Sequence, residues 1–417
     1  MSRKPHYAWF VLTAAWLAFM GVGLIRFVYP YVVPAMEETL GISHAVMGTI
    51  ISGFFWADTV MRIVWGMLSD RFGTRLTTLL GLALLSVGFF IMSFATGIFS
   101  LVIGFIVCGV GAAALFIMPS PLLSRWFGQS RRSTAIGIVT TAATLVTIVA
   151  GFIVPVVLTN NPYNAIWRTE AIFVLVILAV NFFVLADSPA EKGLTPYGAS
   201  IEELDAIKVN SKGNVWARDR ILRVLKDGAF YQIAGSYFVY GVAYTGVLTF
   251  LVGYFVEVGW TAGAASHLVA LFGMAGLIGA LVWGVVGDRL AKRHVFGMTL
   301  GMQGLGILVL VLAGQTPAMA YLGVILFGLG GSGPVVMIAA IQADYFDRST
   351  IGTSFGLCAA CFSIASAVSP IIGGVLADST GTLRSALLMG LVGSLIGAVL
   401  ISLLREPRTV KAVPKSR

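Results

Sequence analysis

Three ionisable residues interrupt stretches of the sequence that are otherwise apolar. Asp58 and Arg62 stand four residues apart in one such stretch, and Arg26 stands in the stretch before it. Residues four apart lie on one face of a helix, so Asp58 and Arg62 can pair. An ionisable side chain inside a membrane span costs at least about 2.5 kcal/mol on insertion scales, so each of the three is a candidate functional residue.

These residue types suit the binding of an anion together with a proton. The guanidinium of Arg26 stays protonated, and its planar fork can bind a carboxylate or phosphate through two hydrogen bonds. Burial disfavours the charged form of Asp58 and a nearby arginine favours it, so proton uptake can depend on whether the arginine holds a ligand. The hypothesis is that Arg26 binds the substrate anion, Asp58 carries the coupled proton and Arg62 links the two. The alternatives are a structural ion pair between Arg26 and Asp58 and a salt bridge that stabilises the second apolar stretch.

The elements that must position these residues are membrane-spanning helices. Of the 417 residues 58% are hydrophobic and only 11% are charged, whereas soluble domains are about one quarter charged. A spanning helix needs about 20 mostly apolar residues, and such continuous runs also exclude the alternating strands of an outer-membrane barrel. The sequence predicts twelve spans, at 9–36, 44–69, 76–96, 99–125, 133–158, 166–187, 228–256, 262–287, 294–314, 317–345, 350–377 and 382–404.

The distribution of basic residues predicts the topology. All but four of the 27 Lys and Arg residues fall on one side of the predicted helices; Arg168 and Arg384 lie opposite, and Arg26 and Arg62 lie within spans. The positive-inside rule then places both termini in the cytoplasm of a bacterial-type inner (plasma) membrane, where the chain contacts lipids. The net charge of +9 therefore reflects topology, and we expect no nucleic-acid partner.

The remaining reactive side chains predict neither a catalytic nor a metal site. Cys108, Cys358 and Cys361 all fall in apolar spans, so no disulfide framework or zinc site is expected. Glu170 and Glu257 fall toward the outer ends of helices, where a charged side chain reaches water. The sequence contains no phosphate-binding glycine-rich loop before a lysine and no H-E-x-x-H motif. We therefore expect no cofactor, no metal and no enzymatic activity.

An internal repeat predicts how the chain is divided. The pattern G-x-x-x-D-R-x-G-x-R occupies residues 66–75, and a degenerate copy occupies 284–293, 218 residues later. A second pair of segments, at 125–137 and 344–356, repeats at an offset of 219 residues. Repeated halves of this kind are typical of transporters that hold their substrate near the bilayer midplane. The predicted parts are an N-terminal bundle at 1–187, a cytoplasmic linker at 188–227, a C-terminal bundle at 228–404 and a cytoplasmic tail at 405–417.

The repeated pattern resembles the signature loop of the major facilitator superfamily, and the resemblance covers essentially the whole chain. It implies an all-α membrane protein with the major facilitator fold, in which twelve transmembrane helices form two pseudo-symmetric six-helix bundles. Charged clusters at the cytoplasmic helix ends would hold one state and break when the halves rock. The gating residues that follow are Gly66, Asp70, Arg71, Gly73, Arg75, Asp288, Arg289 and Arg293. Thr74 and Ala291 depart from the family pattern.

The position of Arg26 adds a second resemblance. Arg26 precedes Pro34 by eight residues, which is similar to the substrate-binding arginine of organophosphate:phosphate antiporters and of anion:cation symporters that import sugar acids. The 218-residue register places Tyr244 at the position equivalent to Arg26. The second basic residue of the organophosphate antiporters is therefore missing, which favours a monoanion over a dianionic phosphate ester.

Further polar residues complete the predicted substrate site. Tyr29 shares a helical face with Arg26, and Tyr240 and Tyr244 share a face of the seventh span. Thr144 belongs to a row of hydroxyl residues in the fifth span. The same side chains could instead serve helix packing or bond within their own helices.

The leading prediction is a secondary active transporter that moves a small organic anion, a carboxylate, by alternating access, coupled to protons or by exchange with a counter-anion. The loop at 343–356 also resembles that of monocarboxylate and oxalate:formate carriers. Asp58 and Arg62 have Gly276 and Ala280 as counterparts in the second half, and this asymmetry favours function over folding. The alternatives are a proton-coupled drug efflux pump, whose signature arginine is missing from the fourth span, and a transporter-like ligand sensor. A monomer is the usual state in the family.

Overall fold

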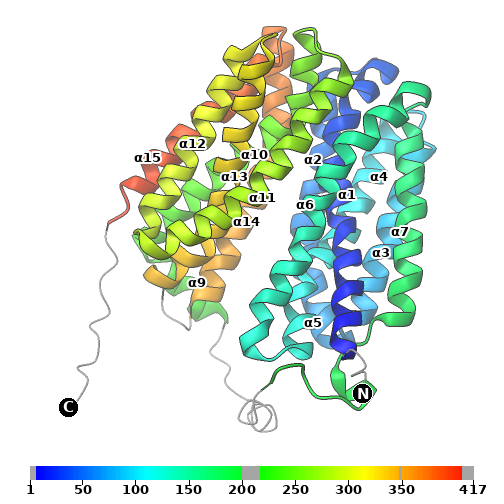
Figure 1. The fold of residues 1–417 in the computed structure, drawn as a ribbon, viewed down its shortest axis with the longest axis vertical. Coiled ribbons are helices and arrows are strands. Elements are labelled where there is room, and N and C mark those ends of the chain that lie inside the picture. Colours follow the sequence, from blue (N-terminus) through cyan, green and yellow to red (C-terminus); the bar gives the residue numbers. More distant parts are fainter. Residues whose placement is uncertain (1–5, 200–216, 347–349, 406–417) are drawn as a thin grey trace. The chain divides into compact units, whose positions relative to one another are not determined.

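The computed structural model describes residues 6–199, 217–346 and 350–405, and this part of the chain is almost entirely helical (Figure 1). The first helices are α1 Tyr7–Leu40, α2 His44–Phe72, α3 Thr74–Ser93, α4 Ile98–Ile117, α5 Pro119–Trp126, α6 Gln129–Asn160 and α7 Asn164–Val184. A 3₁₀ turn at Pro189–Lys192 follows. The later helices are α9 Ala217–Leu225, α10 Gly228–Glu257, α11 Ala262–Arg289, α12 Lys292–Ala313, α13 Pro317–Tyr345, α14 Ile351–Thr380 and α15 Arg384–Ser402.

Eleven helical segments in the described residues are long and apolar enough to cross a membrane. One of them, Ile98–Trp126, combines α4 with α5. α2 falls outside this set because charged residues lower its hydropathy, yet its 29 residues extend about 43 Å, more than the roughly 30 Å of bilayer hydrocarbon. With α2 included, each of the twelve predicted spans coincides with a helical segment to within a few residues. The predicted all-α membrane fold is confirmed.

The described helices group into two compact units. The first unit contains residues 1–212, 245–274 and 366–387, and the second contains 213–244, 275–365 and 388–417. These units follow from which residues pack together, whereas the predicted bundles at 1–187 and 228–404 follow from the sequence repeat. The division into two bundles therefore stays a prediction. Parts of the predicted linker (200–216) and tail (406–417) lie outside the described residues.

In the first unit, α1 packs along α6, α2 packs along α4, and α3 packs against both α4 and α7. A glycine allows one close approach, because a Cβ on Gly109 would overlap the Phe54 carbonyl oxygen and lie 2.9 Å from the Ala57 Cβ. Trp65 then fixes the same two helices by donating from Nε1 to the Val110 carbonyl oxygen at 2.8 Å. The middle of α2, which carries Asp58, is therefore held directly against α4.

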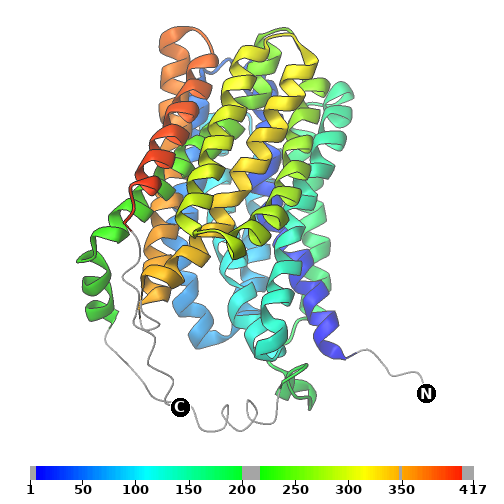
Figure 2. The same cartoon turned by 60° about the vertical axis from the view of Figure 1, so that its left-hand side comes forward.

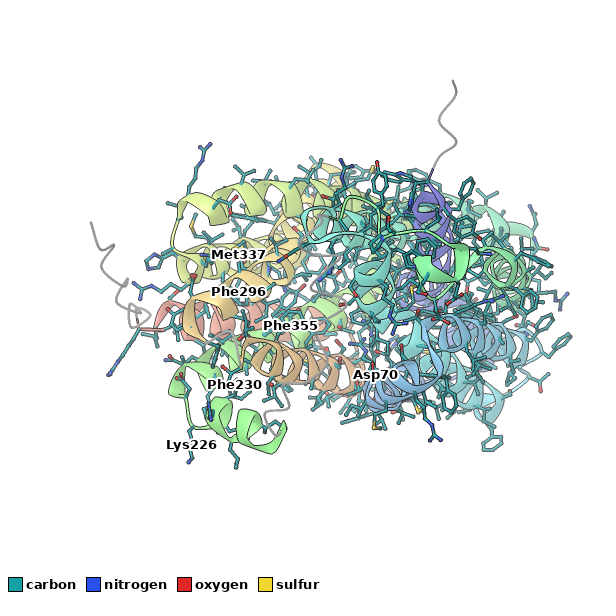
Figure 3. The ribbon with its side chains drawn as sticks, turned by 90° about the horizontal axis from the view of Figure 1, so that it is seen from below. Asp70, Lys226, Phe230, Phe296, Met337 and Phe355 are labelled. Atoms are coloured by element: carbon teal, nitrogen blue, oxygen red, sulfur yellow. The ribbon has the colours of Figure 1, made fainter. Side chains whose placement is uncertain are left out.

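In the second unit, α12 and α13 pack side by side along their length (Figure 2). A buried apolar cluster joins α10, α12 and α13 and includes Phe230, Phe296 and Met337, which Figure 3 labels. Two tyrosines of α10 belong to it, because the rings of Tyr237 and Tyr240 stack with centroids 5.4 Å apart. Aromatic packing therefore forms much of the core of this unit.

Candidate functional site

Three charged side chains from α1 and α2 meet in the first unit. Arg26 and Arg62 both donate from Nη2 to the same carboxylate oxygen, Oδ2 of Asp58. The Arg62 bond is 2.6 Å long. Only 1% of the Asp58 side chain is exposed, compared with 12% for Arg26 and 15% for Arg62. The carboxylate is thus the inner member of the cluster, and the two arginines are its partly exposed members.

Aromatic rings surround the two guanidiniums. The Cζ atom of Arg26 lies 5.7, 5.5 and 5.5 Å from the ring centroids of Phe54, Phe55 and Phe116, respectively. The Cζ atom of Arg62 lies 3.8 Å from the centroid of Phe116. A cation above an aromatic face is attracted to the ring and is held in place without a second carboxylate. Phe116, on α4, is 40% exposed, so it forms the accessible edge of the cluster.

Asp58 and Arg26 each keep one buried polar atom without a hydrogen-bond partner among the described residues. The two atoms are Oδ1 of Asp58 and Nε of Arg26. A buried polar atom without a partner costs about 1–3 kcal/mol, and such atoms call for an explanation. The cluster therefore keeps one buried acceptor and one buried donor that the described residues leave unused.

Tyr29 and Thr144 lie on helices of the same unit. Tyr29 is 1% exposed, and its hydroxyl makes a 2.8 Å hydrogen bond with the Thr249 hydroxyl of α10. Its ring meets Phe55 edge-on, at 6.5 Å between centroids, so it packs beside the aromatic wall. Thr144 is half-buried on α6. The structure thus brings Arg26, Asp58 and Arg62 together and places Tyr29 next to them.

The two predicted tyrosines of α10 lie in the second unit. The Tyr240 ring is fully buried, and its hydroxyl donates to the Gly331 carbonyl oxygen at 2.7 Å. The rings of Tyr240 and Tyr244 are 5.5 Å apart, and Phe327 lies 6.4 Å from Tyr244. Tyr240 therefore has a structural partner for its hydroxyl, and its role in substrate binding stays a prediction.

The first copy of the signature loop is anchored by a residue that the sequence reasoning missed. Asp187 Oδ1 accepts hydrogen bonds from the Thr74 hydroxyl and from the Arg75 backbone N–H, both at 2.8 Å. Gly73, whose φ is +88°, brings the backbone against this carboxylate, which a Cβ would overlap. Arg75 also donates to the Phe182 carbonyl oxygen of α7 at 2.9 Å. Asp187 thereby caps the N-terminus of α3, where the helix dipole favours an anion.

The acidic residue of the loop itself takes no part in this arrangement. Asp70 is exposed near the end of α2 (Figure 3), and no ion pair joins it to another described residue. Arg71 lies with its Cζ 5.2 Å from the Phe72 ring, and Gly66 is half-buried one turn earlier. A signal for Asp187 was available, because it is an acid at the very end of the sixth predicted span, 166–187.

The second copy of the loop makes different contacts. Asp288 and Arg289 are exposed at the end of α11. Lys292 pairs with Asp344 at 3.0 Å, and Arg293 donates to the Leu404 carbonyl oxygen at 2.9 Å. The basic end of this copy therefore fastens α12 to neighbouring segments, and its role in gating stays a prediction.

A second polar cluster, at the opposite end of α2, has no counterpart in the sequence analysis. The carboxylate of Asp378 on α14 accepts hydrogen bonds from the backbone N–H groups of His44 and Ala45, at 3.1 and 3.0 Å. His44 Nδ1 lies 2.9 Å from Glu37 Oε1, and Glu257 accepts from the Leu383 backbone N–H at 2.8 Å. Asp378, from a distant segment of the chain, thus caps the N-terminus of α2 together with the neighbouring Ser43, whose hydroxyl accepts from the Val46 backbone N–H.

The expectation that Glu170 reaches water at the outer end of its helix was wrong. Glu170 of α7 does not reach water, because it is only 5% exposed, and its Oε2 has no hydrogen-bond partner among the described residues. The reason is its face of the helix: Ser86 of α3 bonds to the adjacent Ala171 carbonyl oxygen, so this side of α7 packs inward. A position near the end of a helix therefore does not predict an exposed side chain unless it is also known which face of the helix packs inward.

The family model of the Major Facilitator Superfamily matches residues 15–255 and 233–417. The hexuronate transporter of Bacillus subtilis (strain 168) is 23% identical over 396 residues, 91% of this chain and 90% of that protein. A probable sulfoacetate transporter of Cupriavidus necator is 26% identical over 395 residues, with 90% and 88% covered. The gentisate transporter of Corynebacterium glutamicum is 24% identical over 408 residues, with 95% and 87% covered.

A solved structure shares the fold. A bacterial homolog of the human lysosomal transporter Spinster, in an inward-facing and occupied conformation, matches with a TM-score of 0.73 at 15% identity. The match covers 96% of this chain and 97% of that one. At this level of identity the likeness concerns the fold alone.

Proposed function

This chain belongs to the Major Facilitator Superfamily and is a multi-pass membrane transporter, and we propose that its substrate is a small organic anion that carries a carboxylate. Transport occurs by alternating access across the inner membrane and is coupled to protons or to exchange with a counter-anion. The observation that carries this proposal is the convergence of Arg26 and Arg62 on the buried Asp58. An ionised cluster at mid-span has a high insertion cost, and function is its usual explanation.

The relatives support the same class of substrate. Three of them, each similar over most of this chain, are named as transporters of hexuronate, of gentisate and, as a probable function, of sulfoacetate. These three compounds are small organic anions with a carboxylate group. Their chemistry matches what a partly exposed guanidinium binds well.

The proposed cycle uses the cluster as a switch between two bonds. In the state described, Asp58 occupies the guanidinium of Arg26. Proton uptake by Asp58 weakens this bond, and the substrate carboxylate then takes the place of the aspartate on Arg26. Arg62, which binds the same aspartate oxygen, senses which partner is present. Because substrate and proton compete with the same ion pair, each favours the binding of the other.

Gating and topology complete the proposal. The loops at 66–75 and 284–293 lie on the cytoplasmic side, together with both termini, and the charged residues of the loops form and break contacts during the cycle. The protein acts as a monomer. The basic residues on this side support the orientation, because positive charge is retained in the cytoplasm.

The test is uptake of radiolabelled glucuronate into proteoliposomes, with and without an imposed pH gradient. We expect uphill uptake by the wild-type protein and its loss in Asp58→Asn, which should still exchange glucuronate across the membrane. Full uphill uptake by Asp58→Asn with unchanged pH dependence would exclude proton coupling through this residue. Transport of lipophilic cations and of no organic anion would favour the efflux alternative.

A further inference from the structure

We propose that Arg26 and Arg62 together form one anion clamp, in which Asp58 is a built-in competitor, and that the clamp accepts a dianion. This inference rests on the proposed function and extends it to the class of substrate. The sequence register had placed Tyr244 where a second arginine would be needed, which argued for monoanions. The structure supplies the second guanidinium from the neighbouring helix α2 instead.

The position of the Asp58 carboxylate marks where a ligand oxygen would bind. Both Nη2 atoms donate to the single atom Oδ2, so the two guanidiniums already point at one oxygen. A carboxylate, sulfonate or phosphate oxygen at that place receives both charge-assisted bonds. Arg26 also keeps a buried Nε without a partner among the described residues, which provides a donor for a second ligand oxygen.

Charge decides which ligand suits the clamp. With Asp58 ionised, the cluster of two arginines and one aspartate has a net charge of +1; with Asp58 protonated, the charge is +2. A monoanion leaves the protonated cluster with an uncompensated positive charge, and a dianion neutralises it. A buried charge is tolerated best when it is compensated. A dianion therefore gains more than a monoanion from the presence of Arg62.

The surroundings hold the second guanidinium in place for this role. Arg62 lies with its Cζ 3.8 Å from the Phe116 centroid, close enough for a strong cation–π contact. Phe116 is on α4, so the orientation of Arg62 does not depend on Asp58 alone. When the aspartate takes up a proton, the ring keeps the guanidinium beside Arg26. The clamp is therefore preorganised, which lowers the cost of binding.

The proposal is tested by binding of two probes to the purified full-length protein. Sulfoacetate is the dianion and glucuronate the monoanion, and affinities are measured by calorimetry for wild type, Arg62→Gln and Arg62→Lys. We expect Arg62→Gln to weaken sulfoacetate binding about tenfold more than glucuronate binding, because one charge-assisted bond and one charge are lost. Arg62→Lys keeps the charge and should lie between. Arg168→Gln, which removes a positive charge outside the cluster, is the matched control and should change neither affinity.

A second measurement needs no variant of the cluster. Calorimetry of the wild type in two buffers of different ionisation enthalpy gives the number of protons taken up per sulfoacetate bound. At neutral pH we expect about one proton per anion, because Asp58 must become neutral when the anion takes its place. Equal weakening of both probes by Arg62→Gln, no binding of sulfoacetate by the wild type, or no proton uptake would each overturn the clamp. Binding without transport of either probe in proteoliposomes would instead refute the proposed function and leave the clamp intact.

Discussion

The charge of Asp58 sets the affinity for the substrate in this scheme, and Asp58→Asn tests it directly. The substitution keeps the shape of the side chain and removes the negative charge that Arg26 and Arg62 share. The two guanidiniums bond to the same carboxylate oxygen, and two donors on one acceptor atom typically lie on the order of 5 Å apart. At an effective dielectric constant of about 20, two unit charges at that distance interact by about 3 kcal/mol.

An anion bound to these guanidiniums would lie at a similar distance from the Asp58 carboxylate, so its repulsion from the ionised aspartate would also be about 3 kcal/mol. With asparagine at position 58, a monoanion meets a cluster of charge +2 in place of +1, and the extra attraction of about 3 kcal/mol corresponds to about 100-fold tighter binding. Water screens part of this effect, because Arg26 and Arg62 are 12% and 15% exposed. We therefore expect an increase of at least about tenfold, with wild-type affinity rising as the pH falls and Asp58→Asn affinity independent of pH.

The assay is binding of glucuronate to the purified protein at neutral and acidic pH. Glu38→Gln removes a carboxylate at an exposed position of α1 and serves as the control, which should behave as wild type. Equal or weaker binding by Asp58→Asn would refute the idea that the aspartate competes with the substrate. Such a result would favour a purely structural ion pair.

Three further predictions concern carboxylates away from the cluster. Asp187→Asn should lower the stability of the protein in detergent by roughly 1 kcal/mol, because the N-terminus of α3 loses its anionic cap; unchanged thermal unfolding would contradict the cap. Asp378→Ala leaves the N–H groups of His44 and Ala45 without their acceptor. Hydrogen exchange in the first turn of α2 should therefore become about tenfold faster, which corresponds to about 1.4 kcal/mol. Unchanged exchange in the variant would refute the link between Asp378 and α2. Glu170→Gln should change the free energy of unfolding by no more than about 0.5 kcal/mol, because a buried carboxyl without an ion pair among the described residues is most stable in its neutral form. A large loss of stability would mean that Glu170 is ionised.

The helices could be predicted from the sequence because their apolar runs exceed the thickness of a bilayer. α10 and α13, for example, begin at the predicted residues 228 and 317. α2 was also predicted from its apolar run, although its charges lower its hydropathy. The pairing of Asp58 with Arg62 followed from their spacing on one helix.

Contacts between distant segments could not be predicted in this way. The link between Asp378 and the start of α2 joins residues more than 330 positions apart, and no local pattern encodes it. The pairing of Arg62 with Asp58 was predicted, but its convergence with Arg26 on one carboxylate oxygen was not, because that contact depends on how α1 lies against α2. Glu170 was misjudged because its packing face depends on α3.

The absence of proline from α2 has a mechanical consequence. α1 contains Pro30 and Pro34, whereas α2 runs from His44 to Phe72 as one continuous helix without proline, so no proline kinks it. Asp58 lies about 20 Å along the helix from the turn that Asp378 caps and about 18 Å from Asp70. Asp58 therefore lies near the midpoint of α2, so the charge cluster would act as a pivot with nearly equal lengths of helix on either side. A small rotation of α2 about the charge cluster would therefore move both ends by similar amounts in opposite directions.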